Sequence, residues 1–366
     1  MDLPVMPPLR PMLAKSVKSI PRAGSGPADH LFEPKWDGFR CLVFKDGDEV
    51  ELTSRNTKSL TKYFPEVAQA LGAQLPDKCV LDGEVFVARG DRLDFDCLQA
   101  RVHPAASRIK QLSVETPAGF VGFDCLASGS QSLLDQPMRN RREQLAAILA
   151  DVTAPLYLTQ TTQDPDLAQI WFDQFEGAGL DGLMAKPLDS PYTPNARTML
   201  KLKHQRTADV VLGGYRLHKD STDARPLVGS LLLGLFDAGQ LRHVGVCASF
   251  TLARRAELID QLSTLRASMS DHPWGSEGEI AANPERTPGT RSRWSQGKDL
   301  SFIPLEPSRV LEVGYDHMEG RRFRHTAQFK RWRPDRDPES CGYDQLEEPV
   351  SFELDKVLSG NLGGEQ

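Results

Sequence analysis

The sequence predicts an α+β domain with mainly antiparallel strands, followed by a smaller all-β domain of the barrel type. Strand-like apolar runs separated by turn signals such as Asp46-Gly47 dominate residues 31–204, with helical patterns between them. A boundary follows near residues 204–207, after which short strands enclose a single helix. The 366 residues suffice for two domains that each have a core.

The first domain is expected to span residues 31–204. Its strand-like runs are 39–45, 50–54, 79–88, 120–126, 180–186 and 197–203. Apolar residues at helical spacing predict helices at 65–75, 95–102, 138–151 and 166–176. Residues 1–30 are rich in Pro, Gly and Ser, so we expect an irregular lead-in packed on this domain.

The second domain is expected to span residues 205–337. Strands are predicted at 210–216, 229–236, 241–247, 309–316 and 328–332, with a helix over 252–269. This pattern indicates a small barrel of the oligonucleotide/oligosaccharide-binding type, the OB-fold. Residues 271–298 read as an insertion loop that either contacts nucleic acid through Arg291, Arg293, Trp294 and Lys298 or forms an ordered surface loop. Residues 338–366 are expected to be a loosely attached tail.

Composition excludes several classes of protein. The sequence has no apolar run of membrane-spanning length and no signal peptide at its start. The cysteines are scattered without a C-x-x-C pair, which argues against a zinc site or a disulfide framework and fits a reducing cytoplasm. The net charge is −6, but basic residues cluster at 197–206 and 321–336. Either cluster alone is most simply a solvated face.

The most informative segment is Glu33-Pro34-Lys35-Trp36-Asp37-Gly38. It places a lysine in the frame Lys-x-Asp-Gly on a short turn between strand-like runs. A lysine in this setting can attack the α-phosphate of a nucleotide and carry the nucleotide as a phosphoramidate. The frame alone is a weak signal, since chance produces it in roughly a tenth of chains of this length. Its weight comes from the residues that follow it in order.

A lysine amine is a nucleophile only when it is neutral, and a free lysine has a pKa near 10.4. A like charge at 4 Å costs about 4 kcal/mol at an effective dielectric of 20, which corresponds to roughly three pKa units. Lys201 and Lys203 are one side-chain period apart on a predicted strand, so they point to the same face. They are candidates to supply that repulsion near Lys35 and to bind phosphate charge.

Acidic residues in apolar strands are candidate metal ligands. Glu84 and Asp181 both occur in runs that are otherwise apolar, and carboxylates are the ligands that hard cations prefer. For each residue taken singly, a salt bridge with a basic neighbour is an equally good interpretation.

Three further residues are candidates only in combination. Phe123 can stack on a purine, although a core aromatic is the usual interpretation. Arg55, at the end of a predicted hairpin, can contact a phosphate, although it reads equally as a surface arginine. Arg40 is expected on the same strand edge as Lys35.

Taken in order, these residues resemble the nucleotidyltransferase motifs of ATP-dependent DNA ligases. The matching segments are Lys35-Trp36-Asp37-Gly38 with Arg40, Ser54-Arg55-Asn56, Asp82-Gly83-Glu84, Phe123-Asp124, Asp181-Gly182-Leu183-Met184-Ala185-Lys186, Leu200-Lys201-Leu202-Lys203, and Arg324-His325 through Arg333-Pro334-Asp335-Arg336. The compact form is similar to the actinobacterial LigC-type ligases. Asp181 stands where the family usually has glutamate, and Arg336 where it usually has lysine.

The resemblance implies an adenylation (nucleotidyltransferase) domain, an OB-fold domain and a reaction through lysyl-AMP on Lys35. It implies adenine and ribose contacts by Glu33, Phe123, Arg40 and Glu84, phosphate binding by Lys201, Lys203 and Arg55, and pyrophosphate alignment by Arg333 and Arg336. The implied cofactors are ATP and Mg²⁺ or Mn²⁺, with Asp181 and Glu84 as metal ligands.

The resemblance also implies a cytoplasmic, nucleoid-associated monomer without membrane contact, which acts on nicked or gapped duplex DNA in repair. Because larger ligases carry an extra DNA-binding domain, we expect weak intrinsic DNA binding and a partner such as a repair polymerase or primase-polymerase. Two alternatives remain open. One is an RNA ligase or mRNA-capping-type guanylyltransferase, and the other is a non-catalytic OB-fold nucleic-acid-binding protein.

Overall fold

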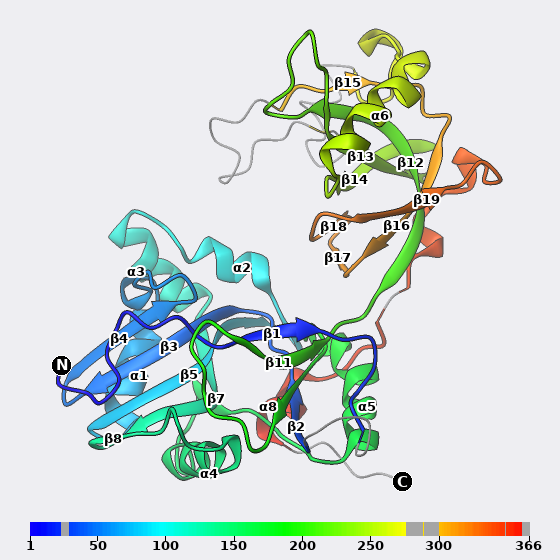
Figure 1. Cartoon of the computed structure of the whole chain (residues 1–366). Coiled ribbons are helices and arrows are strands. Elements are labelled where there is room, and N and C mark those ends of the chain that lie inside the picture. Colours follow the sequence, from blue (N-terminus) through cyan, green and yellow to red (C-terminus); the bar gives the residue numbers. More distant parts are fainter. Residues whose placement is uncertain (23–28, 276–287, 289–299, 348, 361–366) are drawn as a thin grey trace. The chain divides into compact units, whose positions relative to one another are not determined.

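The computed structural model describes residues 1–22, 29–275, 288, 300–347 and 349–360 (Figure 1). The chain divides into two compact units. The first unit comprises Met1–Lys203 together with Pro349–Gln366, and the second comprises His204–Glu348. None of the helices in the described ranges has the length and apolarity that a membrane crossing requires.

The first unit contains a large and a small sheet with helices packed around them. The large sheet consists of β3 (Phe39–Asp46), β4 (Glu49–Ser54), β5 (Lys78–Arg89), β6 (Arg92–Leu93), β7 (Ala118–Ser128), β8 (Gln131–Ser132) and β9 (Leu156–Leu158). The small sheet consists of β1 (Leu13–Ser16), β2 (His30–Pro34), β10 (Leu183–Pro187) and β11 (Arg197–Leu202). The helices are α1 (Pro65–Gln74), α2 (Phe95–Ala100), α3 (Ala106–Glu115), α4 (Met138–Ile148), α5 (Pro165–Gln174) and α8 (Leu354–Ser359), with 3₁₀ turns η1 (Thr61–Tyr63) and η2 (Phe175–Ala178).

The large sheet is buried on both faces. On β3, Cys41 and Val43 pack in the cluster that contains α1, whereas Leu42 and Phe44 pack with Met12 and other residues of the opposite face. Alternate residues of a strand point to opposite faces, so a near-continuous apolar run predicts this double burial. The loop that carries Lys35 joins β2 of the small sheet to β3 of the large sheet.

Several elements differ from the sequence-based expectation. The lead-in is not wholly irregular, because β1 pairs in parallel with β11. Helix α3 was not predicted, since it buries only Ile109 and Leu112 and has a short apolar stripe. In the second unit, α6 (Leu252–Leu262) is shorter than predicted and gives way to 3₁₀ turns η3 (Ser263–Leu265) and η4 (Met269–Asp271).

The predicted tail, 338–366, is divided between the units: residues 338–347 belong to the second unit, and residues 349–360 are attached to the first. The expectation of a loose tail is therefore wrong for its described part. Leu354 and Val357 of α8 are almost fully buried in the cluster that contains Phe175. The amide of Leu354 donates to the carbonyl of Asp91 at 2.9 Å. Burial of two such aliphatic side chains contributes about 1.5–3 kcal/mol each to holding this helix on the first unit.

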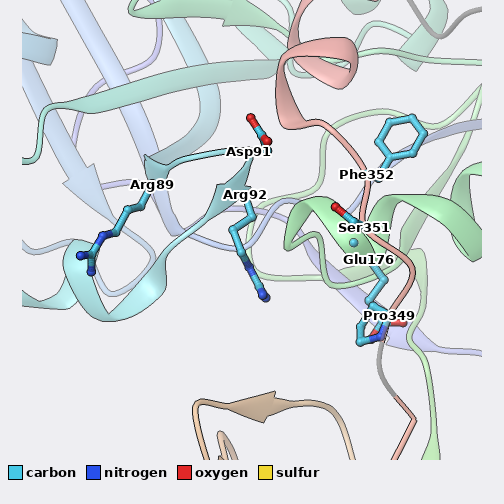
Figure 2. Close-up of a pocket in the computed structure, with 8 residues that line it drawn as sticks. Arg89, Asp91, Arg92, Glu176, Pro349, Ser351 and Phe352 are labelled. Atoms are coloured by element: carbon cyan, nitrogen blue, oxygen red, sulfur yellow. The ribbon is translucent and has the colours of Figure 1, made fainter.

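A pocket of about 250 Å³ lies beside this segment (Figure 2). The β5–β6 hairpin, η2 and the returning tail line it through Arg89, Asp91, Arg92, Glu176, Gly177, Pro349, Ser351 and Phe352. None of the residues that resemble the ligase motifs is among them.

Replacing Gly177 by alanine is expected to release the tail. A Cβ atom at Gly177 would lie 1.8 Å from the Val350 carbonyl oxygen and 2.6 Å from the Phe352 amide nitrogen, both backbone atoms that cannot rotate away. We expect hydrogen exchange in residues 349–360 to accelerate at least about 10-fold, the signature of a locally opened segment. Gly72→Ala on α1 is the control, because its Cβ would meet only Val50 at an ordinary 3.6 Å. Unchanged exchange in Gly177→Ala would contradict the docking.

The second unit is built on a sheet with the strand order β14-β13-β12-β16-β19 and with β15 paired to β12. Its elements are β12 (Arg206–Leu217), β13 (Val228–Asp237), β14 (Gln240–Cys247), β15 (Ile303–Pro304), β16 (Val310–Tyr315), β17 (Met318–Glu319), β18 (Arg322–Phe323), β19 (Gln328–Trp332), α6 and the 3₁₀ turns η6 (Pro338–Ser340) and η7 (Tyr343–Gln345). Trp274 is buried in its core. The basic and aromatic residues of the predicted insertion loop lie outside the described residues.

Candidate active site

Lys35 lies in the loop between β2 and β3, and neighbouring segments hold this loop at three points. The Lys35 amide donates to the Gly182 carbonyl at 2.8 Å, and the Asp181 amide donates to the Lys35 carbonyl at 2.8 Å. The buried Trp36 indole donates to the Thr159 hydroxyl at 2.8 Å. The amine of Lys35 is therefore presented from a fixed backbone.

The Asp181 carboxylate forms ion pairs with two lysines, Lys35 and Lys203, the second at 2.9 Å. Asp181 does not lie in a strand as predicted, but in the loop before β10, where its backbone bonds to that of Lys35. Burial opposes its ionisation, but the two lysine charges outweigh burial and hold the pKa of Asp181 below its ordinary value. The nucleophile candidate is thus paired with a carboxylate that Lys203 shares.

Further cations surround this pair. Lys201 is on β11, and Lys203 follows directly after the strand. The pKa of Lys201 is lowered by partial burial and then by the positive charges of Lys203, Lys35 and Arg55. The fold therefore brings together four cations from three separate segments of the sequence, as a site for phosphate groups requires.

Arg40 is held by two residues whose role the sequence reasoning missed. Its guanidinium donates two hydrogen bonds to Asp82 at 2.5 and 2.6 Å, and the Tyr192 hydroxyl donates to the same carboxylate at 2.6 Å. Asp82 is completely buried. An aspartate in an apolar strand, such as Asp82, indicates a buried ion pair with a basic residue. No motif near Tyr192 in the sequence indicates that its hydroxyl contacts Asp82.

Glu84 lies opposite Arg40 in the β3–β5 register. Burial raises the pKa of Glu84 to about 8, because the opposing charges of Arg40 and Lys35 only partly offset the desolvation of the carboxylate. Near neutral pH this side chain is therefore mainly protonated and can donate as well as accept a hydrogen bond.

A second buried ion pair joins Glu33 to Lys186. The two side chains are 2.7 Å apart and nearly inaccessible, and Lys186 also donates to the Phe123 carbonyl at 2.9 Å. Burial raises the pKa of Glu33, and Lys186 opposes that rise. The Phe123 ring is only 5% exposed and has Arg40 at 4.5 Å and Lys186 at 4.7 Å from its centroid. Lys186 was not singled out from the sequence, although it ends the Asp181 segment.

Two buried polar atoms near this pair lack a hydrogen-bond partner within the described ranges. They are Oε2 of Glu33 and Nη1 of Arg142. Arg142 is fixed by donation from its other terminal nitrogen to the Thr159 carbonyl at 2.7 Å. Buried polar groups are normally satisfied, so these two atoms are candidates for contact with a bound ligand.

Comparison with known proteins decides the family. Residues 11–203 match the model of the ATP dependent DNA ligase domain, and residues 224–336 match that of the ATP dependent DNA ligase C terminal region. The chain belongs to the ATP-dependent DNA ligases. The resemblance inferred from the motifs, the adenylation domain and the OB-fold region are thereby confirmed.

Individual relatives place this ligase close to mycobacterial ligase C. It is 54% identical over 352 residues to DNA ligase C2 of Mycolicibacterium smegmatis, covering 95% of this chain and 97% of the relative. It is 51% identical over 367 residues to DNA ligase C of Mycobacterium tuberculosis, covering 98% and 99%. A solved Lig E DNA ligase has a similar fold, with a TM-score of 0.53 at 17% identity over 88% of this chain and 99% of that one.

Two predicted site residues of the ligase belong to the OB-fold unit. Arg333 and Arg336 follow β19 and are engaged with acidic residues of their own unit. Hydrogen bonds from Arg333 lower the pKa of Asp335 to about 2. The other predicted site residues, Lys35, Arg40, Arg55, Glu33, Glu84, Phe123, Asp181, Lys201 and Lys203, belong to the adenylation domain.

The donor set of the ligase offers little for a metal ion by itself. Among the residues that the structure describes, no three His, Cys, Asp or Glu side chains gather as ligands would. Asp181 is paired with two lysines, and Glu84 holds a proton at neutral pH. One or two carboxylates fit an ion that is bound mainly through nucleotide phosphates and water, as Mg²⁺ commonly is.

Glu84→Gln is expected to make the stability of the ligase less dependent on pH. The folded protein keeps the Glu84 proton up to about pH 8, whereas an unfolded chain loses it near the ordinary carboxyl pKa. Between these values the folded state binds more protons, so stability falls as pH rises through the window. In metal-free buffer, the Tm advantage of Glu84→Gln over the wild type should be small at pH 5 and should grow to several degrees at pH 8.5.

The exposed Glu143→Gln on α4 is the control for this measurement, and it should leave the Tm difference near zero at both pH values. A Glu84→Gln difference that is constant from pH 5 to pH 8.5 would show that Glu84 ionises normally.

Proposed function

We propose that this ligase seals 5′-phosphate/3′-hydroxyl breaks in duplex DNA by carrying AMP on Lys35. The observation that supports this most directly is the amine of Lys35 on a fixed loop beside Lys201, Lys203 and Arg55. Such a group of cations stabilises charge that develops on a phosphoryl group in transfer.

In the first step, the Lys35 nitrogen bonds to the α-phosphorus of ATP as the bond to pyrophosphate breaks. Its proton leaves toward water or toward Asp181, which already contacts the amine. Glu33 and Phe123 hold adenine, while Arg40 and Glu84 hold the ribose. Lys201 and Lys203 neutralise the phosphate, and Arg333 and Arg336 align pyrophosphate.

In the second step, a 5′-phosphate oxygen of the broken strand displaces Lys35 from AMP. Arg55 and Arg40 bind this phosphate. In the third step, the 3′-hydroxyl attacks the activated phosphate, AMP leaves, and the strand is joined. Both displacements are driven mainly by positioning and charge.

The metal is proposed to be Mg²⁺ or Mn²⁺, held by Asp181 and Glu84 together with the phosphates of ATP. When bound, it would neutralise charge on the transferring phosphate. Because Glu84 must lose its proton to act as a ligand, metal affinity should rise with pH up to about 8.

We further propose a role in DNA repair with weak intrinsic DNA binding and help from a partner such as a repair polymerase. The net charge is −6, and several cations of the site are already paired with carboxylates. With few phosphate contacts, affinity for a nicked duplex should fall about 10–100-fold between 50 and 200 mM salt. Fluorescence anisotropy on labelled nicked DNA measures this, and tight binding that salt leaves unchanged would contradict it.

Mass spectrometry after incubation with ATP, GTP or NAD⁺ tests the central proposal. We expect an adduct of one AMP on the peptide that carries Lys35, formed with ATP, and its disappearance when nicked DNA is added. An adduct on another side chain, or one formed from GTP, would overturn it.

A further inference from the structure

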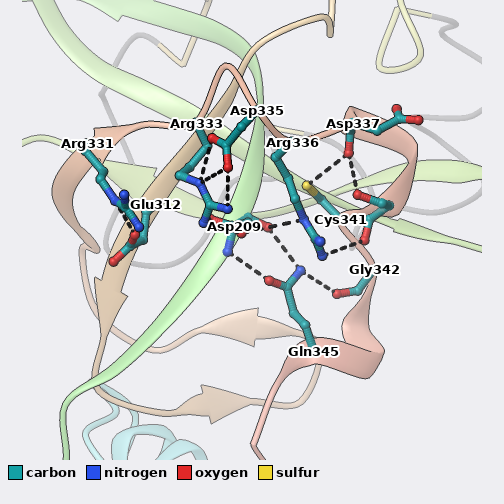
Figure 3. A network of polar contacts seen from close by, with 11 residues as sticks. Asp209, Glu312, Arg331, Arg333, Asp335, Arg336, Asp337, Cys341, Gly342 and Gln345 are labelled. Carbon is teal, nitrogen blue, oxygen red and sulfur yellow. Dashed lines mark hydrogen bonds and ion pairs between the residues drawn. The ribbon is translucent and has the colours of Figure 1, made fainter.

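The two arginines proposed to align pyrophosphate share one carboxylate in the OB-fold unit (Figure 3). Asp209 on β12 accepts from Nη1 of Arg333 through both oxygens, at 3.0 and 2.8 Å. Nε of Arg336 lies 3.6 Å from Oδ2 of the same carboxylate. The Asp209 side chain is only 13% exposed, so it is set back beneath the arginines rather than in solvent.

Asp209 is itself fixed by a side chain from the segment after β19. The Asp209 amide donates to Oε1 of Gln345 at 2.8 Å, and Nε2 of Gln345 donates to the Asp209 carbonyl at 3.0 Å. Nε2 of Gln345 also donates to the Gly342 carbonyl at 2.8 Å. A side-chain amide thus holds the backbone of Asp209 from both sides, which sets the place of its carboxylate.

Asp209 has an acidic neighbour across the sheet, and the repulsion between the two carboxylates is unfavourable. In the β12–β16 register, Asp209 lies directly opposite Glu312, another acid. Like charges in opposite positions of a sheet destabilise it. Arginines on β19 and just after it compensate, since Arg331 donates to Glu312 at 2.7 Å and Arg333 donates to Asp209. The Asp209 carboxylate is therefore balanced by Arg333 and not by its neighbour across the sheet.

The two arginines are held very differently. Nε and Nη2 of Arg333 donate to Asp335 while Nη1 donates to Asp209, so each of its nitrogens is engaged with a carboxylate. Arg336 is 38% exposed, and its contacts are the 3.6 Å ion pair with Asp209 and a long bond of 3.4 Å to the Ser340 carbonyl. Arg336 can therefore offer a guanidinium fork to a phosphate without giving up a strong bond, whereas Arg333 cannot.

We propose that Asp209 is a positioning residue for the nucleotide step, which fixes Arg333 as a scaffold and holds Arg336 poised to bind the pyrophosphate of ATP. The inference rests on the proposed function and refines it, because it assigns the phosphate contact to Arg336. Pyrophosphate takes part only in the formation of lysyl-AMP. Sealing of a nick whose 5′-phosphate already carries AMP should therefore be insensitive to this network.

The test measures three quantities for each full-length variant: the rate of self-adenylylation at saturating and limiting ATP, the rate of sealing of a pre-adenylylated nick, and the Tm. Arg336→Gln should slow self-adenylylation at least about 100-fold without a change in Tm. Asp209→Asn, which keeps the shape but removes the charge, should slow it about 10- to 100-fold. All variants should seal the pre-adenylylated nick within about twofold of the wild type.

The double variant Asp209→Asn/Arg336→Gln should be no slower than Arg336→Gln alone, because Asp209 acts through that arginine. Arg333→Gln should lower the Tm as well as the rate. The matched control is Arg225→Gln, an exposed arginine in the loop between β12 and β13, which should change the rate less than twofold.

Wild-type rates in Asp209→Asn would overturn the inference, and so would additive losses in the double variant. Loss of pre-adenylylated sealing in parallel with self-adenylylation would also overturn it, because the network would then be merely structural. The AMP adduct of the wild type is measured before any variant is compared. If the wild type forms no adduct on Lys35, the proposed function itself fails.

Discussion

Lys35→Ala is expected to form no AMP adduct and to lose ATP-dependent sealing by at least about 10⁴-fold. Among the described residues, the other lysine paired with Asp181 is Lys203, which follows β11 and is itself proposed to bind phosphate. A covalent step cannot be replaced by positioning alone, so the loss should appear in the rate at saturating ATP. Gel-based labelling with radioactive ATP and a nick-sealing assay measure both quantities.

The structure predicts that this variant remains folded. Removing the lysine leaves Asp181 paired with Lys203 at 2.9 Å, so no buried carboxylate is left without a cation. The Tm should change little, and sealing of a pre-adenylylated nick should persist, since that step needs no nucleophile from the protein. Lys110→Ala on the exposed side of α3 is the matched control and should label normally. Labelling of Lys35→Ala at the wild-type level would place the nucleotide elsewhere.

Lys186→Met is expected to give the largest loss of stability. It removes the cation 2.7 Å from Glu33 in a site where both side chains are almost inaccessible, and it also leaves the Phe123 carbonyl without its donor. Breaking one side of a buried ion pair typically costs about 3–5 kcal/mol, because the remaining charge is desolvated and uncompensated. For a unit of this size the Tm should fall by roughly 6–20 °C, as calorimetry would show.

A double variant separates the pair from the packing around it. Glu33→Gln/Lys186→Met removes both charges, so it should recover most of the stability that Lys186→Met loses. Neither variant should use ATP well, because Glu33 is proposed to contact adenine. The exposed Lys110→Met should leave the Tm unchanged. Equal Tm values for Lys186→Met and the wild type would show that Glu33 is not charged in the folded protein.

The sequence was most informative where candidate site residues occur in short motifs that follow one another in a fixed order. Lys35, Arg55, Lys201 and Lys203 were singled out from such segments, and the structure brings them close enough for the other three to lower the pKa of Lys201. The strand predicted over 39–45 is present as β3, whereas its burial on both faces was not predicted. These features depend on local patterns that alternate with a fixed period.

The residues that hold the site were not predictable in the same way. Tyr192 reaches Asp82 across 110 residues of sequence, and Arg333 reaches Asp209 across 124. Such contacts depend on the tertiary fold, so the periodic pattern of apolar residues along the sequence does not predict them. The pairing of Glu33 with Lys186 was missed for the same reason, since buried charges are rare and their partners can come from any strand.

The return of residues 349–360 to the first unit means that the OB-fold region is, in topological terms, an insertion within the adenylation domain rather than an appendage at its end. A polypeptide that stops at Lys203 would therefore lack a piece of its own core, the α8 side chains that cover Phe175. A faithful version of the isolated adenylation domain has to be made from two stretches of sequence, 1–203 and 349–360, joined by an artificial linker. By the same topology, a protease must cut the chain on both sides of the OB-fold region before it can excise that region.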